Sequence, residues 1–144
     1  MNPHKKISIF LVDADAGFYK LLETDLNDKA EYDIRVFKNG EDCLGSLGEH
    51  PDLLILDFEL GQTATGSLAG LQNLEQIKAA QPDLPVIVVA SQDNVEVAVQ
   101  CLRLHVFTYI IKNETAVPRL QIAINTILRY KKMEKTLSWY MAKA

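Results

Sequence analysis

Residues 53–57 read Leu-Leu-Ile-Leu-Asp, a short apolar run that ends in a carboxylate. Similar runs, built mainly from β-branched residues, leucine and aromatics, recur at residues 7–12, 86–90 and 107–111. Residues 32–37 alternate between polar and apolar types and form a weaker fifth run. Near-continuous apolar runs are typical of strands that are buried on both faces, as in a parallel sheet.

The intervals between these runs carry helical patterns. Apolar residues recur every three or four positions at 18–26, 71–78 and 95–102, a shorter helix is expected at 41–47, and a last helix starts near Val117. Strands that alternate with helices predict an α/β fold with helices on both faces of a parallel sheet. Five such units fit a flavodoxin-like (βα)5 fold whose strand order is 2-1-3-4-5.

Length and composition limit the class of protein. The chain has 144 residues, enough for one domain, and its 15 basic and 19 acidic residues give a net charge of −4. The acidic balance argues against direct nucleic-acid binding, and no apolar run approaches the roughly 18 residues of a membrane span. Cys43 and Cys101 have neither disulfide-framework nor zinc spacing and are expected to pack in the core. We therefore expect a cytoplasmic protein with no membrane contact.

Four polar residues follow the predicted strands. Asp13 and Asp15 come at or just after the end of the first strand, Asp57 ends the third, and Lys112 ends the fifth. Ligands of such sheets bind outside the carboxyl ends of the strands. Crowded carboxylates need a cation, Mg²⁺ prefers oxygen ligands, and a lysine can neutralise a phosphoryl group. The pattern predicts a phosphoryl-transfer site, although any one of these aspartates, taken alone, is equally typical of a helix N-cap.

In this order, the strand segments resemble the response regulator receiver domain. The matching stretches are residues 10–13, 51–57, 84–89 and 109–112, and the resemblance covers about residues 5–130. It implies a receiver of two-component signal transduction that takes a phosphoryl group from a histidine kinase or phosphotransfer protein.

The resemblance also implies roles for individual residues. Asp57 matches the phosphoacceptor, and Lys112 matches the lysine that contacts the phosphoryl group. Mg²⁺ would be held by Asp13, by Asp57 and by the backbone carbonyl of Glu59. Tyr109 matches the aromatic residue that changes rotamer in the switch. Apart from this self-phosphorylation chemistry, the family is not enzymatic.

Three departures from the family pattern affect the predicted site. Ala14 replaces the second acid of the usual pair, which lowers the expected Mg²⁺ affinity unless Asp15 compensates through a water molecule. Ala90 stands at the switch threonine or serine, and the neighbouring Ser91 replaces that hydroxyl only if the strand has already ended there. The 58–70 loop is longer than the pattern allows. Ala14 and Ala90 favour an alternative, a degenerate receiver that binds a partner without phosphorylation, whereas Asp57 and Lys112 favour a phosphorylated receiver.

A second alternative belongs to another class. Residues 12–15, Val-Asp-Ala-Asp, also resemble the nucleophile motif of haloacid-dehalogenase-type phosphatases, in which Asp13 would be the nucleophile. That family needs a further acidic pair downstream, and after Lys112 the chain has only the isolated Glu114 and Glu134.

The last helix is longer than a receiver needs. Its apolar residues follow a heptad-like spacing at 120, 124, 127, 130, 133, 137 and 140. We expect a receiver domain at 1–130 and a helical extension at 131–144, typical of the N-terminal module of a larger transcriptional regulator. The extension, or the face formed by the fourth helix, fifth strand and fifth helix, is a candidate homodimer surface, and a solvated extension is the alternative.

Overall fold

The computed structural model describes residues 6–13, 20, 32–58, 67–91 and 95–143. Five parallel strands form one sheet in the order β2-β1-β3-β4-β5, which confirms the predicted fold and order. The strands are β1 (Ile7–Val12), β2 (Tyr32–Phe37), β3 (Leu53–Asp57), β4 (Val86–Ala90) and β5 (Thr108–Ile111). β5 begins one residue later than the sequence pattern predicts.

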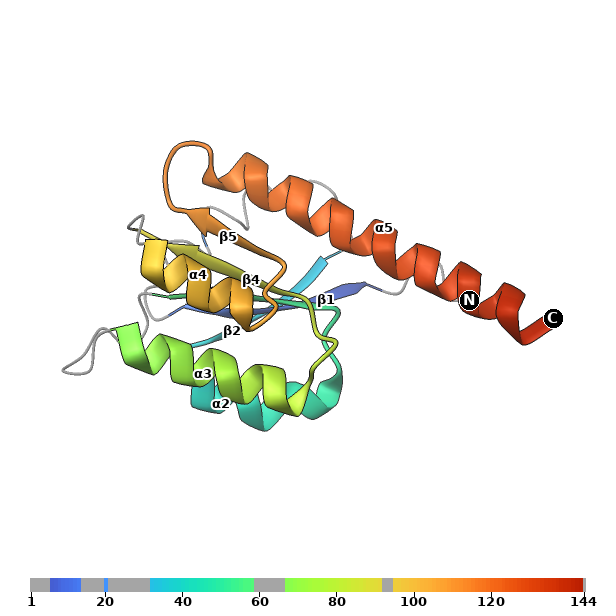
Figure 1. The fold of residues 1–144 in the computed structure, drawn as a ribbon, viewed down its shortest axis with the longest axis horizontal. Helices are drawn as coiled ribbons and strands as arrows, with labels where there is room; N and C mark the ends of the chain where they lie inside the picture. The colour runs from blue at the N-terminus through green and yellow to red at the C-terminus, as the bar shows by residue number, and fades with distance from the viewer. Residues whose placement is uncertain (1–5, 14–19, 21–31, 59–66, 92–94, 144) are drawn as a thin grey trace.

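Helices cover the two faces of this sheet (Figure 1). The described ones are α2 (Gly40–Ser46), the short 3-10 helix η2 (Leu47–Glu49), α3 (Ser67–Ala80), α4 (Val95–Arg103) and α5 (Ala116–Lys143). Of the helix expected at 18–26, the structure describes only Lys20, which is helical. The predicted helix at 41–47 is α2, which starts one residue earlier because the Asn39 side chain accepts a hydrogen bond from the Asp42 backbone N–H and caps it.

Alternate residues of the strands point into two separate cores. Phe10 and Val12 of β1 pack with α2, α3 and α4, whereas Ile9 and Leu11 pack with α5. Every residue of β3 and β4 is buried, which explains their continuous apolar sequence. β2 is an edge strand with one neighbour, so its alternating sequence fits its partly exposed position.

α5 projects beyond the sheet (Figure 1). Its 28 residues correspond to about 42 Å at 1.5 Å per residue. Its buried residues end at Ile127, and from Met133 to Lys143 every residue is exposed. Among the described residues, no helix has the length and apolarity needed to cross a membrane.

Candidate functional site

Two carboxylates lie side by side at the carboxyl edge of the sheet. β1 and β3 are paired with Val12 opposite Leu56, so Asp13 and Asp57 follow on neighbouring strands. Their exposed fractions are only 2% and 3%. Asp13 donates its backbone N–H to the Phe37 carbonyl oxygen at 2.9 Å, and this bond fixes the chain where β1 ends. The strand register therefore brings together two acids that are 44 residues apart in the sequence.

Lys112 reaches the same edge from β5. Its backbone N–H donates to the Ala90 carbonyl oxygen at 2.7 Å, which extends the β4–β5 pairing by one residue. Its Nζ donates to Asp57 Oδ2 at 2.5 Å. The Asp57 side chain is 4% exposed and the Lys112 side chain 22% exposed. A carboxylate that is so deeply buried needs a charged partner, because burial removes its hydration.

The donor chemistry of this edge suits a small hard cation. Mg²⁺ is usually bound by one or two carboxylates and keeps several waters, so Asp13 and Asp57 are sufficient as protein side chains. Within the described residues there is no group of three or more histidine, cysteine, aspartate or glutamate side chains placed to hold a metal. The other predicted ligands, Asp15 and the Glu59 carbonyl, and the atypical Ala14, lie outside those residues.

The three predicted switch residues occupy different environments. Ala90 is the last residue of β4 and is 6% exposed. Ser91 is exposed and comes directly after β4 has ended. This is the position at which its hydroxyl was expected to replace the missing one. Tyr109 lies opposite Val88 and is half-buried against the core on the α2–α4 side of the sheet.

Phe58 and Gly70 lie close together in the structure but do not stand out in the sequence pattern. Phe58 follows Asp57, is 4% exposed, and donates its backbone N–H to the Val89 carbonyl oxygen at 2.8 Å. A Cβ atom added to Gly70 of α3 would lie 3.0 Å from Phe58 Cζ. The sequence pattern places Gly70 at the end of the 58–70 loop, whereas it lies within α3, so the pattern carried no signal for this close approach.

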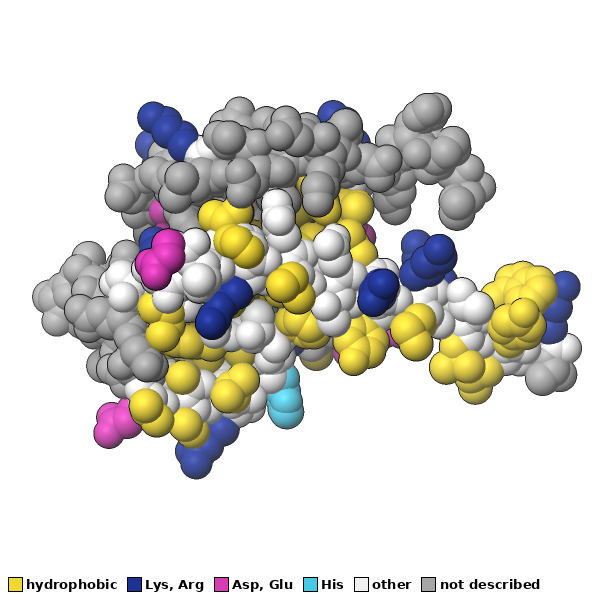
Figure 2. All heavy atoms as spheres, turned by 90° about the horizontal axis from the view of Figure 1, so that it is seen from above, with side chains coloured by type: hydrophobic (Ala, Val, Ile, Leu, Met, Phe, Trp, Pro, Cys, Tyr) yellow, Lys and Arg dark blue, Asp and Glu magenta, His cyan; other side chains and the backbone are white. Residues whose placement is uncertain are grey.

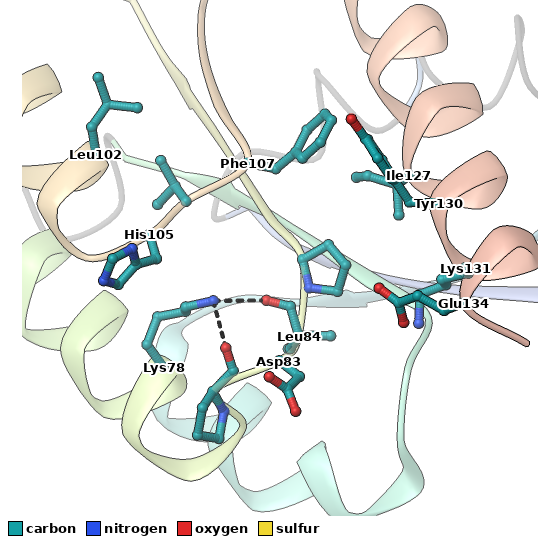
Figure 3. A pocket seen from close by; sticks show the side chains of 13 residues that line it. Lys78, Asp83, Leu84, Leu102, His105, Phe107, Ile127, Tyr130, Lys131 and Glu134 are labelled. Atoms are coloured by element: carbon teal, nitrogen blue, oxygen red, sulfur yellow. Dashed lines mark hydrogen bonds between the residues drawn. The ribbon is translucent and has the colours of Figure 1, made fainter. Parts of the chain in front are cut away.

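A separate cavity of about 630 Å³ lies elsewhere (Figure 3). It is lined by the segments that precede β4 and β5, residues 82–85 and 105–107, together with Lys78 and residues of α5. Lys78 Nζ donates to the Pro82 and Leu84 carbonyl oxygens, both at 3.0 Å, and burial lowers the pKa of Lys78. Because Asp57 lies at the carboxyl ends of the strands and this cavity at their amino ends, the cavity is not part of the acidic site.

The chain is similar in sequence to proteins of one known family. The family model for the response regulator receiver domain matches residues 9–125. The regulatory protein LuxO of Vibrio vulnificus is 31% identical over 98 residues, which are 67% of this chain and 20% of LuxO. The transcriptional regulatory protein ZraR of Salmonella typhimurium is 29% identical over 108 residues, 74% of this chain and 23% of ZraR. The chain thus spans about a fifth of the length of these relatives.

A solved structure agrees in fold. The signal receiver domain of a LuxO repressor protein from Vibrio parahaemolyticus aligns with a TM-score of 0.77 and 22% identity, over 92% of this chain and 97% of that domain. The family match covers most of the sheet and its helices, including Asp13, Asp57 and Lys112. The chain belongs to the response regulator receiver domain family, whose members are signalling modules of two-component systems.

Proposed function

We propose that Asp57 accepts a phosphoryl group from a histidine kinase or a phosphotransfer protein. The observation that carries this proposal is the buried Asp57 carboxylate, held 2.5 Å from Lys112 Nζ with Asp13 on the neighbouring strand. Strand ends hold all three side chains, so the carboxylate is oriented before a donor arrives.

In the transfer, an Asp57 oxygen attacks the phosphorus atom of a phosphohistidine. The new P–O bond forms as the P–N bond breaks, and the electron pair of the P–N bond returns to the donor imidazole. Lys112 is placed to contact the incoming phosphoryl oxygens, because its amine already lies beside the acceptor carboxylate. Its side chain is the more exposed of the pair and can adjust its position as charge accumulates.

Asp13 and Asp57 would hold Mg²⁺ at this edge. Bound there, the ion supplies positive charge to phosphoryl oxygens. The proposal for this chain rests on two nearly fully buried carboxylates on adjacent strands, one of which is already paired with a lysine. Carboxylates that lie close together repel one another, and a divalent cation between them would offset that repulsion.

Intact-protein mass spectrometry tests the acceptor. The full chain is incubated with Mg²⁺ and acetyl phosphate, and the added mass of one phosphoryl group is expected on the wild type and not on Asp57→Asn. Omission of Mg²⁺ should abolish labelling. An unmodified wild type, under conditions that label a known receiver, would overturn the proposal.

Ala90 supports a second candidate, a receiver that binds a partner without phosphorylation. Its methyl group is buried at the end of β4, where it offers the phosphoryl group no hydroxyl. Under this function Asp57→Asn leaves partner binding unchanged. The same mass measurement therefore separates the two candidates, since the second requires no labelling.

We further propose that the domain is the N-terminal module of a cytoplasmic transcriptional regulator and acts as a homodimer. The relatives named above are regulators of which this chain matches only 20–23%. Two exposed apolar surfaces are available for pairing (Figure 2). One lies on α4 and the residue before β5, with Val99, Leu102 and Phe107 at 41%, 55% and 37% exposure.

The other surface is on α5, and we favour it as the dimer contact. Tyr130, Met133, Leu137 and Tyr140 are 55–64% exposed and follow a heptad spacing of 3, 4 and 3. They form one stripe along the part of the helix that projects from the domain, here called the α5 stripe. Two copies that pair through this stripe would bury these side chains, as a and d positions do in a coiled coil.

Charge determines the direction of this pairing. With Tyr130 at position a, Arg129 occupies g and Glu134 occupies e. A parallel pair places Arg129 opposite Glu134 of the second copy, on both sides of the stripe. An antiparallel pair instead brings Glu134 near Glu134 and Arg129 near Lys143 of the second copy. Since opposite charges favour the parallel arrangement, the α5 stripe is proposed as a parallel homodimer contact.

Sedimentation velocity over a concentration series tests this contact. Arg129→Glu and Glu134→Arg should each weaken the dimer, and the double variant should recover it. Lys132→Glu, which makes the same charge change on the far side of α5, is the control. A wild type that stays monomeric, or a double variant no better than the single ones, would overturn the α5 contact.

A further inference from the structure

The first turn of α3 lies directly against the residue that follows the acceptor. A Cβ atom at Gly70 would lie 3.0, 3.1 and 3.2 Å from the Cζ, Cε2 and Cδ2 atoms of Phe58. Contacts this short are rare between real side chains, so any larger residue at position 70 must displace the ring or the helix by a few tenths of an ångström. The glycine therefore permits an approach that no other residue allows.

The ring of Phe58 has little room to move. It is 4% exposed and belongs to the core that includes Leu71 and Leu74 of α3. Cores are packed nearly as densely as organic crystals, so a displaced ring pushes on its neighbours. The backbone at Phe58 is also held, because its N–H donates to the Val89 carbonyl oxygen at 2.8 Å.

α3 makes a second close contact one turn further along. A Cβ atom at Gly40, the first residue of α2, would lie 2.5 Å from Cγ of Asn73. Residues 70 and 73 are neighbours on the helix surface. The first half of α3 thus makes close contacts with both Phe58 and α2. An added group at position 70 is therefore taken up at Phe58 more readily than by a tilt of the helix.

We propose that Gly70 is a positioning residue for phosphoryl transfer, which it serves by setting where Phe58 and therefore Asp57 lie. This inference rests on the proposed function of Asp57. Asp57 pairs with Val89, the residue that also accepts the Phe58 hydrogen bond. Because the ring is confined in the core, part of the strain from an added methyl falls on the Phe58 backbone, one peptide unit from Asp57. The Asp57 carboxylate must meet Lys112 at 2.5 Å. Displacements of tenths of an ångström matter to a reaction that depends on alignment.

The test compares two glycine substitutions in the full chain. Gly70→Ala adds a methyl group against Phe58, whereas Gly45→Ala in α2 adds one into open space. Both are glycine-to-alanine changes within a helix, so they share the same gain in helix propensity. Rates of labelling by acetyl phosphate at saturating Mg²⁺ and the Mg²⁺ dissociation constant are measured below the melting temperature of each variant. These readouts on folded protein do not respond to a change in stability alone.

We expect Gly70→Ala to lower the labelling rate by roughly threefold to tenfold, given that a 1 Å misplacement can cost about a hundredfold. Gly45→Ala should match the wild type. Phe58→Leu removes the ring atoms that the new methyl would meet. Adding Gly70→Ala to Phe58→Leu should therefore lower the labelling rate only slightly. Equal rates for the two alanine variants, or the same loss in the Phe58→Leu background, would overturn the inference. A wild type that is not labelled overturns the function of Asp57, and the role of Gly70 falls with it.

Discussion

Replacing Lys112 by methionine tests how far the buried Asp57 carboxylate depends on the lysine amine beside it. The substitution removes the amine that lies 2.5 Å from Asp57 Oδ2 and keeps an unbranched apolar stem. The Asp57 side chain is 4% exposed, so it regains little water when its partner is lost. Breaking a buried pair from one side costs about 3–5 kcal/mol. Since Asp57 lies at the edge of the sheet, we expect about 3 kcal/mol at pH 7 without divalent cations.

The opposite change should cost less. Asp57→Asn leaves Lys112, whose side chain is 22% exposed and can turn its amine to solvent. We expect a loss of about 1 kcal/mol, typical of one hydrogen bond. For a chain of 144 residues, 3 kcal/mol corresponds to a fall of about 10 °C in melting temperature. Thermal unfolding followed by circular dichroism, with a chelator present, resolves a difference of this size.

The pH dependence identifies the cause. In Lys112→Met the buried Asp57 carboxylate lacks the lysine amine, and protonating a buried carboxylate removes the cost of burying its charge. The free energy of unfolding of the variant should therefore approach that of the wild type as the pH falls from 7 towards about 4. Mg²⁺ should also reduce this difference in free energy of unfolding between the variant and the wild type. Lys132→Met, at an exposed position of α5, is the control. Equal losses for Lys112→Met and Asp57→Asn, or a gap that is unchanged at low pH, would refute the reasoning.

Three smaller predictions concern other parts of the fold. Burial raises the pKa of Cys43 to about 12 and of Cys101 to about 11, so both thiols should react with a disulfide reagent at pH 8 only after unfolding. The thiols of the unfolded chain lose their protons at lower pH than those of the folded chain, so the free energy of unfolding should fall as the pH rises from about 9 towards 11. This fall should be smaller in Cys43→Ala. Asn39→Ala removes the α2 cap, and denaturant titration should show a loss of about 1 kcal/mol. His105 has a φ of 64°, so His105→Gly should be about 1 kcal/mol more stable than His105→Ala.

The sheet was predictable because its central strands are buried on both faces. β3 and β4 are continuous apolar runs, and such runs separated by helical patterns admit few topologies. The same rule placed Asp57 and Lys112 on one edge, although 55 residues separate them. Strand and helix ends were less predictable. The pairing of β5 with β4 begins at Thr108, and the apolar Phe107 just before it lies outside the paired residues. Apolarity alone therefore does not mark where this strand begins.

Contacts that depend on the distance between two elements were not predictable. Hydrophobic spacing shows that α3 packs on the sheet but not how closely, so the approach of Gly70 to Phe58 had no equivalent in the sequence pattern. The cavity beside Lys78 likewise depends on how α5 crosses the segments that precede β4 and β5. Periodicity specifies which face of an element is buried, whereas these distances follow from the sizes of all the side chains between two elements.

The turn between β5 and α5 joins the acidic site to the α5 stripe. Three residues separate Lys112 from Ala116, the first residue of α5. Asn113 holds this turn, since its Oδ1 accepts hydrogen bonds from the Thr115 backbone N–H at 2.8 Å and from Thr115 Oγ1 at 2.6 Å. The Ala116 N–H also donates to the Asn113 carbonyl oxygen at 3.0 Å. A movement of Lys112 at the site therefore reaches the start of α5 through a short, hydrogen-bonded connection. The α5 stripe, proposed to pair two copies, lies on that same continuous helix beyond its last buried residue, Ile127.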